Sequence, residues 1–199
     1  IEYGLPASIA DKMQFTGYIP RSVPKAKKQV EVRQELGISD EEKLVVVTTG
    51  GGGDGHKVLK TYLDMLHKYG SMPYKTVMVS GPFLPKELRD SFTGHCEEMG
   101  LHCFGFYKGI ERLMAAADLV VCMGGYNTTC EVLSLGKVSL VIPRHYPRKE
   151  QLIRAQVFKQ HGLLDYIPWG GLKPKGLHDK IKALLENPEP YQKAIAEFP

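Results

Sequence analysis

The sequence predicts an α/β protein in which a parallel β-sheet carries α-helices on both faces. The segment "KLVVVTT" at 43–49 is a continuous β-branched run closed by glycine, which is typical of a strand buried on both faces. The residues after it, 55–69, place apolar side chains at helical spacing. Strand-like and helix-like segments then alternate as far as residue 167, and this order favours a parallel sheet.

The predicted elements follow one another with short connections. The segment "MQFTGYI" at 13–19 is expected to form a short strand, and 20–42 is expected to be a surface loop rich in Lys, Pro and Glu. Further strands are predicted at 43–49, 74–81, 101–106, 118–124, 137–143 and 163–167. Helices are predicted at 55–69, 85–99, 110–117, 126–135, 148–162, 174–186 and 189–197.

Length and composition allow one large α/β domain or two small ones, but the sequence shows no second core and no low-complexity linker. With 199 residues, of which 43% are hydrophobic, the chain is long enough for one sizeable core. We therefore expect 1–42 to be a lead-in strand and loop of the same domain as 43–199. The net charge of +4 is scattered, which argues against a nucleic-acid partner and favours anionic ligands.

The start of the sequence has neither the basic region nor the long apolar region of a signal peptide. No apolar run reaches the roughly 18 residues that would span a bilayer. Because the sequence does not begin with methionine, we expect a piece of a longer protein.

The four cysteines form no C-x-x-C pair. Two of them lie in "HCEEMGLHC", beside His95 and His102, but this spacing matches no common zinc motif. We therefore expect reduced cysteines in a cytoplasmic protein, and no metal.

The stretch "VVVTTGGGGDGHKVLK" at 45–60 places five glycines within Gly50–Gly55, between a predicted strand and a predicted helix. A glycine loop at this junction lets the backbone approach a ligand, and the N–H groups of the next helix favour phosphate. A purely structural turn would explain one or two glycines, but not five. The loop therefore predicts an anion site.

Three phosphate-binding motifs compete for this loop. A P-loop needs a hydroxyl after its lysine, where this sequence has Val58. The dinucleotide pattern G-x-G-x-x-G fits Gly50, Gly52 and Gly55, but the acid expected at the end of the second strand is missing from Ser80-Gly81-Pro82. The glycine loop of nucleotide-sugar transferases is the third option, and the loop alone does not decide among them.

A second strand–glycine–helix junction lies in 117–155. Gly124 and Gly125 follow the strand, and the hydroxyls of Thr128 and Thr129 in the first helical turn predict a second anion site. Beyond it come Glu131 and a basic loop, and Glu150-Gln151 then open a helix with side chains suited to sugar hydroxyls.

These residues carry a specific resemblance. The pattern "D-hydrophobic-VVC-x-GGYNTTCE…LGK…VIPR…R-x-EQ-x-x-RA" resembles the carboxyl-terminal, donor-binding half of glycosyltransferase family 28, typified by MurG-like enzymes. The resemblance covers roughly 43–168. It implies one Rossmann-like half of a GT-B fold, in which two such domains enclose the active site.

The resemblance also implies roles for residues that would hold a UDP-sugar. Contacts to the diphosphate are implied for Gly51, Gly52, Gly53, Gly124, Gly125 and Thr128. The loop at Tyr107 is implied to contact the uracil edge, and Glu131 is implied to bind the ribose hydroxyls. Glu150 and Gln151 are implied to contact the donor sugar. Arg144, together with Arg148, is expected to supply positive charge near the diphosphate.

Three features depart from the family pattern. The first residue of the pair that contacts the donor sugar is often glutamine or aspartate in the family, where this sequence has Glu150. The family often has serine where this sequence has Gly53. Asp54 is also unusual, because a carboxylate would repel phosphate, and we expect it to cap the following helix instead.

The implied activity is inverting transfer of a hexosyl or N-acetylhexosaminyl group from a UDP-sugar, with UDP-N-acetylglucosamine as a candidate donor, to a lipid-linked or polysaccharide acceptor. No cofactor is implied. The general base belongs to the family's amino-terminal domain, which we expect to be absent here, so the chain alone should not catalyse transfer. His56 and His145 are side chains that could act as a general base, but we interpret them as loop histidines near the anion sites.

Two alternatives stay open. One is half of a UDP-sugar 2-epimerase, and the other is a non-catalytic nucleotide-sugar-binding subunit of a split transferase. In each transferase hypothesis the partner is the missing acceptor domain or a separate acceptor-binding subunit. The location implied is cytoplasmic, at the inner face of the membrane, with membrane contact made through that missing half.

Overall fold

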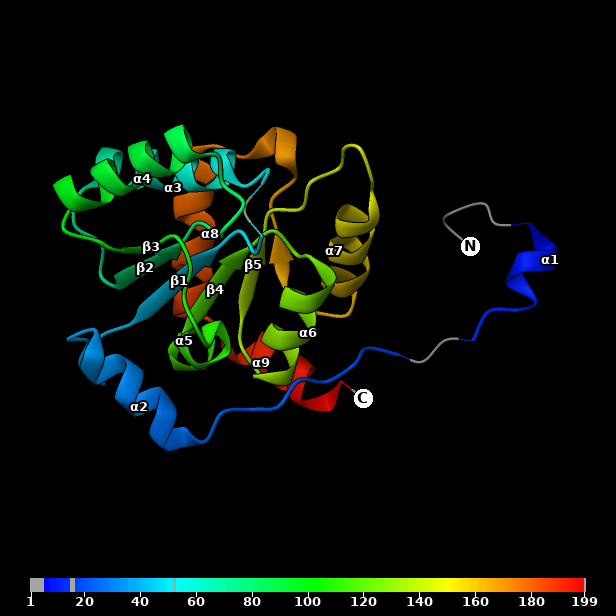
Figure 1. The fold of residues 1–199 in the computed structure, drawn as a ribbon. Helices are drawn as coiled ribbons and strands as arrows, with labels where there is room; N and C mark the ends of the chain where they lie inside the picture. Colours follow the sequence, from blue (N-terminus) through cyan, green and yellow to red (C-terminus); the bar gives the residue numbers. More distant parts are fainter. Residues whose placement is uncertain (1–5, 15–16, 52, 199) are drawn as a thin grey trace.

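The computed structural model describes residues 6–14, 17–51 and 53–198. Within them, six parallel strands form one sheet in the order β3-β2-β1-β4-β5-β6, which confirms the predicted fold class (Figure 1). The strands are β1 (Leu44–Thr48), β2 (Lys75–Val79), β3 (His102–Phe104), β4 (Leu119–Cys122), β5 (Ser139–Val141) and β6 (Asp165–Tyr166). Every predicted strand from residue 43 onward is present.

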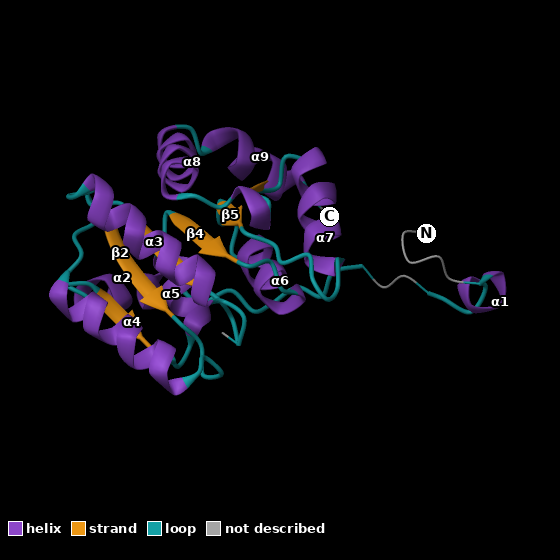
Figure 2. Cartoon of the chain, turned by 90° about the horizontal axis from the view of Figure 1, so that it is seen from above, coloured by secondary structure: helices purple, strands orange, loops and turns teal. Residues whose placement is uncertain are grey.

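The predicted helices from residue 55 onward are present too, and helices surround the strands when the molecule is seen from above (Figure 2). They are α3 (His56–Tyr69), α4 (Lys86–Glu98), α5 (Ile110–Ala116), α6 (Tyr126–Ser134), α7 (Glu150–Gln160), α8 (Pro174–Glu186) and α9 (Glu189–Glu197). A short 3₁₀ helix, η1 (Trp169–Gly171), precedes α8.

The core has a layer on each face of the sheet. Val45 and Val47 of β1 belong to a cluster with side chains of α3, α4 and α8. Leu44 and Val46 of the same strand belong to a cluster on the other face, with α2, α5, α6, α7 and α9. Each such fully buried side chain contributes about 1.5–3 kcal/mol of hydrophobic stabilisation. Because both faces of β1 are buried, its sequence is an unbroken apolar run.

The lead-in segment differs from the prediction. A helix, α2 (Ala26–Glu35), forms inside 20–42, where the sequence predicted a surface loop. Its Val32 is buried in the core, whereas most of its other side chains are charged or polar, so its helical pattern is weak in the sequence. A further short helix, α1 (Ala7–Ala10), lies apart from the sheet (Figures 1 and 2).

The strand predicted at 13–19 is not found. Residues 13–14 and 17–19 have no strand structure, and 15–16 lie outside the described residues. The chain instead runs along α6, where Tyr18 stacks on Tyr126 and the N–H of Arg21 donates to Ser134 Oγ at 2.8 Å.

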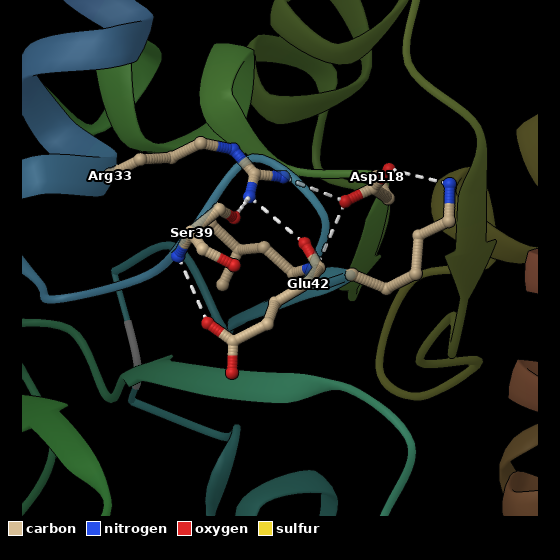
Figure 3. A network of polar contacts seen from close by, with 6 residues as sticks. Arg33, Ser39, Glu42 and Asp118 are labelled. Carbon is tan, nitrogen blue, oxygen red and sulfur yellow. Dashed lines mark hydrogen bonds and ion pairs between the residues drawn. The ribbon is translucent and has the colours of Figure 1, made fainter.

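A polar network fixes α2 at the amino edge of the sheet (Figure 3). Asp118, just before β4, accepts hydrogen bonds from Arg33 of α2 at 2.9 Å, from Lys43 at 3.1 Å and from the N–H of Leu44 at 2.8 Å. Arg33 also donates to the carbonyl oxygens of Ser39 and Glu42. One carboxylate thus joins α2, β1 and β4.

The expectation that all four cysteines are reduced is wrong. Cys96 at the end of α4 and Cys103 in β3 form a disulfide, where the sequence predicted reduced thiols. Cys122 and Cys130 are buried free thiols, and burial raises the pKa of Cys122 to about 11. Within the described ranges, no group of three or more His, Cys, Asp or Glu side chains is placed to hold a metal ion. None of the helices described there is long and apolar enough to cross a membrane.

Candidate functional site

Two glycine loops meet at the carboxyl edge of the sheet. One follows β1 and leads into α3, and the other follows β4 and leads into α6. They are neighbours because β1 pairs with β4, with Thr48 opposite Cys122. The loops lie against each other, since a Cβ added at Gly50 would be 3.7 Å from Thr128 Oγ1.

Both following helices begin with free N–H groups. Gly55 is the N-cap of α3 and Gly125 is the N-cap of α6, and no side chain among the described residues caps either end with a hydrogen bond. Such a helix start offers unpaired N–H donors and the positive end of the helix dipole, the combination that binds anions.

A cavity of about 810 Å³ opens between the two loops and the loop after β5. Its lining includes Gly51, Gly53, Gly125, Thr128, Arg144 and Gln151. A smaller cavity of about 150 Å³ adjoins it, lined in part by Tyr107 and Glu131. Thr128 lines both, so most of the residues implied for donor binding surround one continuous region.

A groove of about 800 Å³ lies at the opposite, amino edge of the sheet, and its lining includes Gly37, Gly70 and Gly100. These glycines follow the ends of α2, α3 and α4, so the helix dipoles present their negative ends there. Ligands of open parallel sheets bind beyond the carboxyl ends of the strands. We therefore take the glycine-loop cavity as the functional site.

The glycines of the two loops differ in what they do. Gly124 has φ +73°, and a Cβ there would lie 2.6 Å from Val141 Cγ1, so the fold itself requires glycine. At Gly53 and Gly125 a Cβ would meet nothing within 4 Å. Packing does not demand glycine at these two positions, and the missing side chain leaves the backbone open to a ligand. Gly52 lies outside the described residues.

Thr128 and Thr129 of α6 differ in whether their hydroxyl is available to a ligand. Thr129 is buried, and its hydroxyl donates to the carbonyl oxygen of Gly125 at 2.9 Å. Its hydroxyl is therefore occupied by the helix, contrary to the predicted role in anion binding. Thr128 faces the two cavities and keeps the predicted position.

Glu131 lies one turn further along α6, half-buried at the smaller cavity. Burial raises the pKa of its carboxyl, with a smaller lowering by the charge of Arg21. Tyr107 lines the same cavity and packs edge-on against Phe104, with ring centroids 5.1 Å apart. Burial raises the pKa of Tyr107 as well.

Arg144, in the loop after β5, holds two carboxylates. Its Nη1 donates to Asp54 Oδ2 at 2.9 Å and its Nη2 donates to Glu150 Oε1 at 3.1 Å. The backbone N–H of Arg144 donates to Gln151 Oε1 at 3.1 Å. The sequence predicted that Asp54 caps α3. Asp54 instead pairs with Arg144, and Gly55 occupies the cap position.

These contacts favour the charged forms of Arg144 and Glu150. Burial raises the pKa of Glu150, but the hydrogen bond and charge of Arg144 outweigh it and hold that pKa below its usual value. The hydrogen bonds to Asp54 and Glu150 raise the pKa of Arg144.

The histidines lie elsewhere. His56 is the exposed first residue of α3 and lines a groove between α3 and α4. His145 is exposed, and neither histidine is among the residues lining the two cavities, nor is Arg148. Lys57 donates to the carbonyl oxygen of Trp169 at 2.9 Å, which holds it away from a phosphate-binding position.

Sequence reasoning assigned no role to Arg154, whose Nη1 donates to the carbonyl oxygen of Gly124 at 2.8 Å. Its position four residues after Glu150, on the same face of α7, was the available signal. In the described part of the chain five buried side-chain polar atoms lack a partner, and four surround this edge: Ser80 Oγ, Arg144 Nε, Glu150 Oε2 and Arg154 Nε. Unpaired buried groups are rare in folded proteins, so their concentration favours this edge as the candidate site.

The parallel sheet and its paired glycine loops define a Rossmann-like domain of the kind that forms one half of a GT-B glycosyltransferase. The chain belongs to glycosyltransferase family 28, because residues 18–198 match the Glycosyltransferase family 28 C-terminal domain. This confirms the resemblance recognised in the sequence.

Curated relatives carry the name UDP-N-acetylglucosamine--N-acetylmuramyl-(pentapeptide) pyrophosphoryl-undecaprenol N-acetylglucosamine transferase. The protein of Streptococcus uberis is 33% identical over 147 residues, covering 70% of this chain and 41% of the relative. That of Alkaliphilus oremlandii is 26% identical over 136 residues, covering 68% and 37%. The chain thus spans about two fifths of these relatives.

Among solved structures, Acinetobacter baumannii MurG superposes with a TM-score of 0.66 at 14% identity, covering 92% of this chain and 51% of that one. The glycosyltransferase VinC in complex with dTDP superposes with a TM-score of 0.62 at 17% identity, covering 89% and 39%. These similarities show the shared fold.

Proposed function

We propose that this chain is the donor-binding domain of an inverting glycosyltransferase that moves a hexosyl or N-acetylhexosaminyl group from a UDP-sugar to a lipid-linked or polysaccharide acceptor. The observation that carries the proposal is the pair of uncapped helix N-termini, of α3 and α6, at one cavity on the carboxyl edge of the sheet. Two such ends suit a diphosphate, which carries charge on two neighbouring groups.

In this proposal the backbone of Gly51, Gly53 and Gly125, together with Thr128, binds the diphosphate. Glu131 accepts hydrogen bonds from the ribose hydroxyls, and the loop at Tyr107 contacts uracil. Glu150 and Gln151 bind the donor sugar. All of these residues except Glu150 line the two adjoining cavities, which supports the assignment. Glu150 lines neither cavity, but it accepts a hydrogen bond from Arg144, which lines the larger one.

Transfer requires an acceptor hydroxyl to attack the anomeric carbon while the bond from that carbon to the diphosphate breaks. Negative charge then grows on the leaving UDP. Backbone N–H groups and helix dipoles already directed at that position stabilise the charge without rearranging. A base must take the acceptor's proton, and we place it in the acceptor half, within a longer chain or on a separate subunit.

The name that these relatives carry supports UDP-N-acetylglucosamine as the first donor to test and a lipid-linked acceptor. As part of the same proposal, we place the domain in the cytoplasm, at the inner face of the cytoplasmic membrane. We further propose that residues 1–42 belong to the same domain as 43–199, and that this chain alone binds donor without transferring its sugar.

Calorimetric titration of the chain with UDP, UDP-N-acetylglucosamine, ADP and NADH tests the proposal. We expect saturable binding of the two uridine nucleotides and weaker or no binding of ADP and NADH. Preferential binding of NADH would contradict the assignment and favour a dinucleotide site. If none of the four nucleotides binds, the proposal that the glycine loops form a nucleotide site is contradicted.

A further inference from the structure

The chain before α2 is fastened along α6, the helix whose first turn lines the larger cavity (Figure 1). Tyr18 stacks on Tyr126 with ring centroids 5.6 Å apart, and the N–H of Ile19 donates to Tyr126 Oη at 3.3 Å. At the other end of the helix, the N–H of Arg21 donates to Ser134 Oγ at 2.8 Å. This segment is therefore fixed at both the first and the last residue of α6.

Arg21 reaches from this segment to the turn of α6 that lines the cavity. Its Nη2 donates to Asn127 Oδ1 at 3.2 Å, while its backbone is held at Ser134. Asn127 and Ser134 are seven residues apart, which is about two turns along one face of the helix. The side chain of Arg21 therefore lies along this face. Asn127 lines the larger cavity, next to Thr128.

The contact with Arg21 determines which end of the Asn127 amide faces a ligand. A guanidinium carries N–H donors and no acceptor, so the oxygen of the amide must face it. The two N–H groups of Asn127 Nδ2 then point away from Arg21 and remain available at the cavity. Rotation of the amide would exchange oxygen and nitrogen with little change of shape. An amide N–H group binds a phosphate oxygen, whereas an amide oxygen repels it.

Orientation outweighs the charge of Arg21 as the means by which this residue acts. Both Arg21 and Asn127 are exposed, so water and salt screen an effect of the guanidinium that acts through charge alone. Arg21 is also not among the residues that line either cavity. Its influence on a ligand in the larger cavity therefore passes through Asn127.

We propose that Asn127 binds the diphosphate of the donor through its side-chain amide, and that Arg21 is a positioning residue that keeps the N–H groups of this amide toward the cavity. The inference rests on the proposed function, because it adds a side-chain donor to the backbone N–H groups of α6 at the same diphosphate. It also gives the lead-in segment a part in nucleotide binding.

Calorimetric titration of the full chain with UDP compares the wild type with Asn127→Ala, Arg21→Met and the double variant, at about pH 8. Burial raises the pKa of Glu131 and the charge of Arg21 lowers it, but at this pH a half-buried glutamate is ionised in every variant. Lys25→Met is the matched control, because Lys25 is an exposed cation of the same segment and lines neither cavity. Circular dichroism verifies that each variant is folded.

Asn127→Ala should weaken UDP binding at least about tenfold, because a hydrogen bond to a charged phosphate is lost. Arg21→Met should weaken it at least about threefold, because the amide must then be ordered when UDP binds. Lys25→Met should leave the affinity unchanged. The double variant should bind UDP as Asn127→Ala does, since Arg21 acts through Asn127.

The side-chain NH₂ resonances of Asn127 in the ¹⁵N-labelled chain provide a readout that a merely structural role of Arg21 would not move. They should shift with UDP in the wild type, with the affinity found by calorimetry, and shift less in Arg21→Met. Unchanged UDP affinity in Asn127→Ala, or an equal loss from Arg21→Met with and without Asn127, would overturn the inference while UDP binding by the wild type still supports the proposed function. Absence of UDP binding by the wild type would overturn both.

Discussion

Glu131 is the residue on which nucleotide recognition depends most directly in this account. Its half-buried carboxyl has a raised pKa because burial disfavours the charged form. Ribose hydroxyls need the ionised carboxylate as acceptor, so protonation removes their partner. UDP affinity should therefore be full above the pKa of Glu131 in the free protein and decline as the pH falls through it.

This decline should begin at a higher pH than an ordinary glutamate with a pKa of about 4.3 would give. Calorimetric UDP titrations between neutral pH and about pH 5 measure it. Glu131→Gln should bind at least about tenfold more weakly at neutral pH, because it loses a charge-assisted hydrogen bond of about 1.5–3 kcal/mol. Its affinity should also vary less with pH. Identical pH profiles in the two proteins would refute the role of this carboxylate.

At the residue scale, the sequence predicted the glycine loops, but not which polar groups remain free. Thr128 and Thr129 are indistinguishable as letters, yet the hydroxyl of Thr129 is bound by a carbonyl one turn back. The pairing of Asp54 with Arg144 joins loops 90 residues apart. Such a contact depends on strand order, which local patterns do not specify.

The carboxylate of Asp118 is the main polar link between helix α2 and the sheet, in addition to the apolar packing of Val32. Asp118 binds Arg33 of α2 while also bonding Lys43 and the N–H of Leu44 (Figure 3). Replacing Asp118 with Asn removes the charge and leaves the largely buried guanidinium of Arg33 without its anion. We expect the free energy of unfolding to fall by about 1–3 kcal/mol.

Urea unfolding measures this change. Asp40→Asn serves as the control, because Asp40 is an exposed acid in the neighbouring turn and should alter stability by less than about 0.5 kcal/mol. Equal unfolding free energies for Asp118→Asn and the control would show that the network does not anchor α2.

At the element scale, strong periodicity made prediction reliable from β1 onward. The buried strands and the amphipathic helices α3 and α8 each bury a regular set of apolar residues. Helix α2 was missed because one buried valine among many charged residues does not produce a clear helical pattern. The strand expected at 13–19 is not found in 13–14 or 17–19, and Tyr18 and Arg21 contact α6 there instead.

At the scale of the whole molecule, the alternation of strands and helices predicted a parallel sheet with ligand contacts at one edge. The alternation alone did not predict that β1 and β4 are adjacent. It was the family resemblance that implied that the two glycine loops contact one diphosphate. Phe83 and Tyr146 at the larger cavity are 75% and 80% exposed. In our proposal this edge faces the acceptor half, which completes the site.

The central claim is that one nucleotide binds across both glycine loops. Titration of the ¹⁵N-labelled chain with UDP, followed by backbone amide resonances, tests it most directly. The account predicts saturable shifts of Gly51, Gly53, Gly125 and Thr128 with one common affinity, and shifts near Tyr107 and Glu131. Shifts confined to one glycine loop, or centred on the groove around Gly70 and Gly100 at the opposite edge, would contradict it.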